Sequence, residues 1–292
     1  MSQRITIQCN PANPVNYLAC CGLFDLLARM DAGTLGWWPT KAPVAFLLES
    51  EVTEADFLAT VLPSLSSASC WRFGRAPAGE VPVRVVVQFA SPGKPPFSVA
   101  LDWWFETAEL DGTIREKSAW KMYAGNQSLT QIITERMIPA CAAIREERAT
   151  PMTAIWLLEA SYNLTGRFGF DPRGAVNAMD RGYSPDGVGE PVPTFPFSEL
   201  LATFGLHSFF PSRTGPAGRV QSTRGWRGAD DGEGEKGFAY CLWLEPVPVP
   251  LARLAAVRPT ALGTRTLFAP RAMRKNYSNL TLARTIQSTV TP

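Results

Sequence analysis

The chain has 292 residues, of which 46% are hydrophobic and 18% are charged, and its net charge is +2. About 25% charged residues is usual for soluble domains, so the charged fraction of this chain is low. The chain also contains nine tryptophans and 16 phenylalanines. A low charged fraction together with many aromatic residues is typical of a protein that buries part of its surface in an assembly. No apolar run approaches the roughly 18 residues that span a bilayer, the N-terminus is polar, and the six cysteines form no C-x-x-C pair. We therefore expect a cytoplasmic protein with free, mostly buried thiols.

The first half of the chain has the patterns of both strands and helices. Residues 4–9 alternate in polarity as a strand does, and Asn13 followed by Pro14 predicts the capped start of a helix. Residues 83–89 and 97–105 predict two strands joined by a turn rich in proline. The other expected elements are a core helix at 15–30, a strand at 44–48, and helices at 53–65, at 129–148 with an interruption at Pro139, and at 152–163.

The second half is rich in glycine and proline, and much of it is expected to be irregular and basic. The whole chain therefore predicts an α+β fold of mixed helices and antiparallel strands with an irregular, loop-rich second half. We expect an α+β N-terminal domain over residues 1–165 and a basic C-terminal region over 166–292, with one continuous domain as the alternative. The elements expected in the second half are a helix at 197–210 capped by Ser198 and a strand at 238–244, after which a proline-rich stretch at 246–250 leads into residues 251–257.

The residue types that catalysis and metal binding require are scarce. The single histidine, His207, lies in an apolar setting with no partner nearby in sequence, which excludes most zinc sites and Ser-His-Asp machinery. No glycine-rich phosphate-binding motif is present, and the acidic residues Asp102, Asp230 and Asp231 give no specific pattern for magnesium. We expect a protein that is not an enzyme, with no catalytic residue, no metal and no cofactor. A metal-independent RNA endonuclease is the weaker alternative.

A segment in the middle of the chain combines cations, aromatic rings and amides just before an expected helix. Lysines contact phosphates, aromatic rings stack on unpaired bases, and amides pair with base edges. A surface loop whose rings plug the core is the alternative. The candidate nucleic-acid-binding residues of this segment are Lys117, Trp120, Lys121, Tyr123, Asn126 and Gln127.

Positive charge is segregated in the second half, although the total is small. Residues 211–228 and 251–292 contain no Asp or Glu, and phosphate is bound by such local clusters. We expect the first stretch to be a loop that orders on nucleic acid, with a solvated basic surface as the alternative. The tail from residue 265 is expected to be an arm that lies along RNA, with a terminal helix packed on its own domain as the alternative. The candidate residues are Arg213, Arg219, Arg224 and Arg227 in the loop and Arg271, Arg274, Lys275 and Tyr277 in the tail.

Several short motifs occur in an order that resembles one family of CRISPR-associated proteins. The family is a subunit of the type I-U (also called type I-G) Cascade complexes, described as a short variant of the large subunit, and the similarity spans about residues 10–260. The motifs are Asn13-Pro-Val-Asn-Tyr-Leu-Ala-Cys-Cys-Gly-Leu-Phe24, Gly36-Trp-Trp38, Lys121-Met-Tyr-Ala-Gly-Asn-Gln-Ser128, Gly169-Phe-Asp-Pro-Arg-Gly-Ala-Val176, Asp180-Arg-Gly-Tyr-Ser-Pro185, residues 199–211, and Leu242-Trp-Leu-Glu-Pro246.

The resemblance implies a non-catalytic subunit of an RNA-guided DNA-binding complex. A large subunit of this kind sits at the 5′ end of the guide (CRISPR) RNA and contacts PAM-proximal target DNA. The implied partners are the guide RNA, double-stranded target DNA, a backbone subunit that coats the RNA, a fused subunit that processes and caps the guide, and a transient helicase-nuclease. A structural adaptor that holds the complex together without reading the PAM is the alternative.

Overall fold

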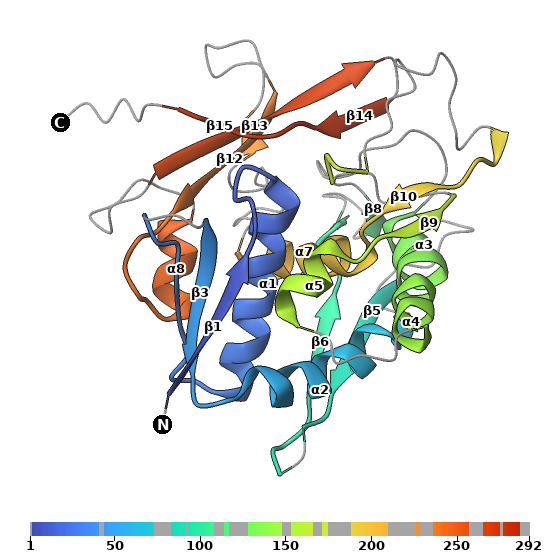
Figure 1. The fold of residues 1–292 in the computed structure, drawn as a ribbon. Helices are drawn as coiled ribbons and strands as arrows, with labels where there is room; N and C mark the ends of the chain where they lie inside the picture. Colours follow the sequence, from blue (N-terminus) through green and yellow to red (C-terminus); the bar gives the residue numbers. More distant parts are fainter. Residues whose placement is uncertain are drawn as a thin grey trace.

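The structure, a computed structural model, consists of helices and antiparallel sheets, and it is therefore α+β as the sequence predicts (Figure 1). None of the described helices is long and apolar enough to cross a membrane. The residues that the structure describes are 2–40, 44–72, 83–91, 93–107, 114–116, 128–147, 153–165, 171–174, 188–209, 226–227, 236–256, 265–274 and 277–286.

Helix α1 (Pro14–Met30) lies at the centre of the fold. Asn13 caps it as predicted, because the Asn13 Oδ1 accepts a hydrogen bond of 2.9 Å from the Val15 backbone N–H. Pro14 occupies the first turn, where its missing N–H has no partner to lose. Nearly every side chain of α1 is buried, so α1 is a core helix surrounded by other elements.

The packing of α1 against α7 (Pro196–Phe209) depends on two glycines. A Cβ atom on Gly22 would overlap the Leu201 carbonyl, and a Cβ on Gly205 would overlap the Leu18 carbonyl. Glycine therefore allows the two helix backbones to approach more closely than any larger residue would. Helix α7 begins at Pro196, so the expected capping role of Ser198 is wrong. This residue lies fully buried in the first turn of the helix.

Two three-stranded antiparallel sheets flank the helices, with the orders β1–β3–β2 and β4–β5–β6. The first strand corresponds to the predicted strand at 4–9, and β5 and β6 form the predicted hairpin. Helix α2 (Glu54–Leu65), capped by the Thr53 side chain, packs against β5. The strands are β1 (Gln3–Gln8), β2 (Leu35–Trp37), β3 (Ala45–Ser50), β4 (Ser69–Arg72), β5 (Val83–Phe89) and β6 (Phe97–Leu101).

The helical stretch predicted at 129–148 changes its geometry ahead of Pro139. Helix α3 (Leu129–Ile132) passes through a π-helical turn, η1 (Ile133–Met137), into α4 (Ile138–Glu146). Because Pro139 has no N–H to donate and its ring crowds the preceding turn, a wider turn before it accommodates the proline without ending the helix.

The helix expected at 152–163 is shorter in the structure. Helix α5 (Ala154–Glu159) ends before the chain forms strand β9 (Tyr162–Leu164), which pairs with β10 (Val192–Thr194). A second two-stranded ribbon joins β7 (Phe105–Thr107) to β8 (Ile114–Glu116).

The basic tail belongs to an antiparallel sheet, so the expectation of an irregular arm is wrong. Strand β13 (Arg265–Arg274) pairs with β12 (Gly237–Leu242) along its first half, and Leu267 and Leu280 are buried in the core. The Ala283 N–H donates to the Ala12 carbonyl just before α1, at 2.6 Å. The described residues of the tail are therefore packed on their own domain, as the alternative expects, but as strands, so the helix of that alternative is wrong. The other elements of this region are β11 (Trp226–Arg227), α8 (Val249–Ala255), β14 (Tyr277–Leu280) and β15 (Arg284–Thr285).

One hydrophobic cluster joins both halves of the chain. It contains residues of α1 and β5 from the first half and residues of α7, β12 and β13 from the second. In Figure 1 the C-terminal sheet lies across the end of α1 at which that helix begins, where the Tyr240 hydroxyl donates to the Pro11 carbonyl. The boundary expected at residue 165 therefore does not separate two cores, and this packing favours the alternative of one continuous domain.

Candidate functional site

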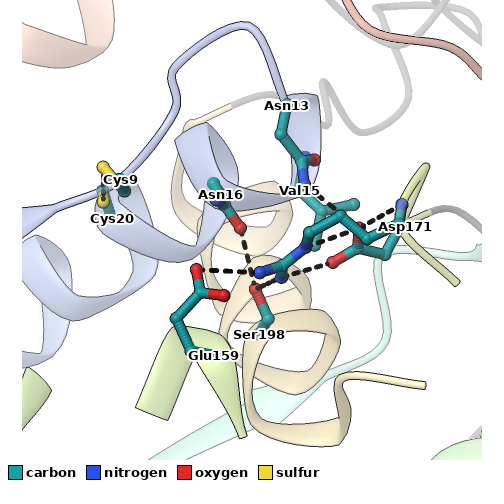
Figure 2. A network of polar contacts seen from close by, with 9 residues as sticks. Cys9, Asn13, Val15, Asn16, Cys20, Glu159, Asp171 and Ser198 are labelled. Atoms are coloured by element: carbon teal, nitrogen blue, oxygen red, sulfur yellow. Dashed lines mark hydrogen bonds and ion pairs between the residues drawn. The ribbon is translucent and has the colours of Figure 1, made fainter. Parts of the chain in front are cut away.

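A buried carboxylate joins the start of α1 to the turn at residues 171–174. Asp171 is 2% exposed, and its Oδ1 accepts hydrogen bonds from the Asn13 Nδ2 at 3.0 Å and from the Arg173 backbone N–H at 2.9 Å. Figure 2 shows Asn13 and Asp171 facing one another across this contact. The residue that caps α1 therefore also holds the turn, and both belong to motifs that carry the family resemblance.

Arg173 connects this carboxylate to two further helices. Its guanidinium donates to both oxygens of Asp171, at 3.1 and 2.7 Å, to the Glu159 Oε1 on α5 at 3.0 Å, and to the Ser198 Oγ on α7 at 3.3 Å. It also lies 3.7 Å from the centre of the Phe195 ring. Burial alone would lower the pKa of Arg173, but the hydrogen bonds and negative charges of Asp171 and Glu159 outweigh burial and raise it. Arg173 is therefore a permanently charged structural group.

The network closes on the first turn of α7. The Ser198 Oγ donates to the Asn16 Oδ1 at 3.2 Å, and the Asp171 backbone N–H donates to the Glu199 Oε1 at 3.2 Å. Figure 2 shows Asn16, Ser198 and Glu159 grouped around the same point. These polar groups are paired with one another, so the arrangement clamps α1, α5, α7 and the turn together, and we assign it no catalytic role.

An aromatic cluster joins the motif that contains Asn13 to two more of the motif segments. Tyr17 stacks on Trp38 with ring centres 5.5 Å apart, and its hydroxyl donates to the Cys241 carbonyl at 3.0 Å. The Trp243 Nε1 donates to the Gly36 carbonyl at 2.7 Å. Motifs that are more than 200 residues apart in sequence thus meet in one core, and many of the residues that carry the resemblance determine the fold.

The cysteines are free thiols in the structure, and five of the six are buried. Burial raises the pKa of the Cys20, Cys21 and Cys141 thiols well above the ordinary value, which disfavours the reactive thiolate. The Cys9 and Cys20 sulfurs lie 3.5 Å apart between β1 and α1 (Figure 2). These thiols are therefore unsuited to nucleophilic catalysis.

The segment with the strongest nucleic-acid pattern, residues 117–127, lies outside the described residues, but its C-terminal end is fixed. Ser128 forms a capping box with Gln131 at the start of α3. The Thr130 Oγ1 donates to the Val83 carbonyl at 3.0 Å and accepts a hydrogen bond from the Trp104 Nε1 at 3.1 Å. The start of α3 is thereby attached to the beginning of β5.

The structure brings parts of the two basic clusters into one sheet. Arg227 on β11 pairs with Gly237 on β12, and Gly237 pairs in turn with Pro270 on β13, the neighbour of Arg271. Arg271 is half-buried, and burial lowers its pKa. Arg274 pairs with Tyr277 at the far end of the β13–β14 hairpin. The side chains of Arg227, Arg274 and Tyr277, and the whole of Arg213, Arg219, Arg224 and Lys275, lie outside the described part of the structure.

Two of the residues considered for catalysis or metal binding, His207 and Asp102, occupy structural positions, whereas Asp230 and Asp231 lie outside the described residues. His207 is half-buried on α7. Asp102 is 8% exposed and forms an ion pair of 3.3 Å with Arg84. Within the described ranges, no group of three or more His, Cys, Asp or Glu residues could hold a metal ion.

The chain was compared with protein-family models, with the curated proteins and with the solved structures, and none of the three comparisons found a match. Sequence analysis missed the pairing of Asp171 with Arg173 and Asn13, and it also missed the exposed Trp71 of β4. The Asp-Pro-Arg sequence was visible as a motif, but its partner 158 residues away was not.

Proposed function

We propose that the chain is a non-catalytic subunit of a type I-U (type I-G) CRISPR surveillance complex, which contacts the guide RNA and PAM-proximal target DNA. The observation that carries the proposal is the meeting of the motif segments. Tyr17 contacts Trp38 and Cys241, Trp243 contacts Gly36, and Asn13 contacts Asp171. The motif segments are therefore parts of one core, which is compatible with a resemblance that spans about residues 10–260.

The arrangement of the described residues is also compatible with binding of nucleic acid. Ser128, the residue that directly follows the segment at 117–127 in the sequence, caps α3 through a capping box. The strands that carry Arg227 and Arg271 lie in one sheet, so two acid-free stretches of the sequence reach the same part of the molecule.

A structural adaptor is the second candidate function, and the surface of α8 favours it. Leu251 and Leu254 are 45% and 58% exposed and lie three residues apart, hence on one face of the helix. An exposed apolar face of this kind is typical of a contact with another protein. The two functions differ in whether the chain affects the choice of PAM.

The experiment that separates them measures DNA binding by a reconstituted complex on target duplexes with different PAM sequences. The variant Asn126→Ala/Gln127→Ala is compared with wild type and with the matched control Gln3→Ala/Asn163→Ala, which removes two exposed amides elsewhere. We expect the first variant to alter the order of PAM preference, because amides contact base edges, and the control to leave it unchanged.

Equal PAM preference in all three complexes, with normal assembly, would reject PAM contact by this segment and favour the adaptor. Cleavage of guide RNA by the isolated chain without added metal would instead support the endonuclease alternative.

A further inference from the structure

The sheet β4–β5–β6 has one apolar face and one polar face. Val85, Val87 and Phe89 of β5 are fully buried on the face that packs against helices. The opposite face carries Ser69, Trp71, Arg84, Val86, Gln88, Ser98 and Ala100, as the alternation of side chains along paired strands requires, and Val86 is buried there. This face, which we call the outer face, is mostly polar and partly exposed to solvent.

Trp71 is the exception on the outer face, because its large ring is 56% exposed. Trp37, Trp38, Trp103, Trp104 and Trp243 are each at most 8% exposed, and Trp156 is half-buried. The Trp71 Nε1 donates to the Ser69 Oγ at 3.0 Å, two residues along the same strand. The only polar atom of the ring is thus satisfied locally, which fixes the orientation of the ring while much of its surface stays exposed.

The neighbours of Trp71 point to the kind of ligand that the ring would take. Arg84 is directly opposite Trp71 in the β4–β5 ladder and is held by its ion pair with Asp102 at 3.3 Å. A protein partner would be expected to contact a cluster of apolar residues, but among the described residues of β4, β5 and β6 Trp71 is the one large apolar side chain that is exposed. The polar neighbours of the ring are the Ser69 hydroxyl and the Arg84 guanidinium, and a single exposed ring beside a cation is instead typical of a surface that stacks on a nucleobase.

The start of α3 lies at the same end of the sheet as Trp71. Val83, whose carbonyl accepts the hydrogen bond from Thr130 of α3, pairs with Arg72, the residue that follows Trp71. In the sequence, Arg72 and Arg75 follow Trp71, and the next acidic residue is Glu80, so the local charge favours a polyanion.

We infer that Trp71 is a stacking platform for an unpaired base of a single-stranded nucleic acid, either guide RNA or a strand of opened target DNA. The inference rests on the proposed function, because it requires that nucleic acid reaches this subunit. It goes beyond it by naming a residue, a contact and the single-stranded form of the ligand. Stacking on an aromatic ring tolerates any base, so the contact would contribute affinity without sequence preference.

The test measures fluorescence anisotropy of a short labelled oligo-uridine RNA and of an oligo-thymidine DNA on titration with the full chain. Replacing Trp71 with Ala should weaken binding by about 5- to 150-fold, the range that corresponds to one stacked base, whereas Trp71→Phe should retain most of the affinity. The matched control Leu254→Ala removes an exposed apolar side chain on α8 and should bind like wild type. Because Trp71 is exposed, thermal unfolding of Trp71→Ala should be close to that of wild type.

Each outcome of this experiment either supports or rejects the stacking platform. A larger loss on RNA than on DNA would support contact with the guide, and the reverse would support contact with the opened target strand. If Trp71→Ala binds both oligonucleotides as wild type does, the stacking platform is rejected while the proposed function stands. If that variant binds normally but no longer assembles with the other subunits, Trp71 is a protein contact and the inference is likewise rejected. If wild type binds neither oligonucleotide, the inference fails, and the PAM experiment on the complex judges the proposed function separately.

Discussion

Replacing Arg173 with Ala removes the main partner of the buried Asp171 carboxylate. Asp171 would lose two guanidinium donors, at 3.1 and 2.7 Å, and would keep the Asn13 amide and one backbone N–H. Breaking a buried ion pair by removing one partner costs about 3–5 kcal/mol. The two remaining donors place the expected loss at the lower end, about 3 kcal/mol, which is a large part of the roughly 5–15 kcal/mol that stabilises a typical protein.

Urea unfolding followed by circular dichroism measures this loss. The double variant Arg173→Ala/Asp171→Asn should recover part of it, because it removes the charge that Arg173→Ala leaves without its partner. Glu159→Gln serves as the matched control at the other end of the same guanidinium. The Glu159 side chain is 56% exposed, so the variant should lose less than about 1 kcal/mol.

Two results would refute this reasoning. A loss below about 1 kcal/mol for Arg173→Ala would place the network among ordinary surface ion pairs. A double variant that is no more stable than Arg173→Ala would show that the buried charge of Asp171 is not the source of the cost.

Three further predictions concern the helices and the tail. Gly205→Ala should lower the unfolding free energy by about 1–3 kcal/mol, although alanine normally favours a helix, because its Cβ would overlap the Leu18 carbonyl; an unchanged thermal transition would contradict the close helix packing. Burial alone would raise the pKa of Asp31, but hydrogen bonds from two backbone N–H groups and a serine hydroxyl hold that pKa below its ordinary value of 3.8. The ionised Asp31 carboxylate therefore contributes fully to the unfolding free energy above its ordinary pKa, and this contribution is lost as the pH falls through the lowered pKa of the folded state. Asp31→Asn should flatten the acid side of a plot of unfolding free energy against pH. Parallel plots for the variant and wild type would contradict this prediction. Ending the chain at Pro270 removes the buried Leu280 and should lower the unfolding temperature or cause aggregation, whereas a normal transition would restore the idea of a separate arm.

The elements that sequence analysis predicted are those determined by local chemistry. The cap of α1 follows from Asn13 and Pro14, and the β5–β6 hairpin follows from two apolar runs around a proline-rich turn. Strand β13 was missed because its stability comes from pairing with β12, which is distant in sequence. Pro270 also argues against a strand, but it sits opposite Gly237, where β12 begins, so it costs the sheet little.

The candidate site could be predicted only in part. The segment at 117–127 and most of the basic residues were identified by composition, and they lie outside the described residues, so their contact with nucleic acid stays a prediction. The network around Asp171 could not be predicted, because a single sequence does not reveal which of 26 acidic residues pairs with a given arginine. The exposure of Trp71 could not be predicted either, because a single sequence does not reveal which face of its strand packs against the core.

The proposal that this chain works on guide RNA is tested most directly by the RNA that accompanies it. The chain, tagged and expressed together with the proteins encoded beside its gene and with a CRISPR array, is purified under native conditions, and the bound RNA is sequenced. We predict that mature guide RNA copurifies with the chain and is strongly enriched over total RNA. Recovery of a stable complex that contains no guide RNA would contradict the proposed function.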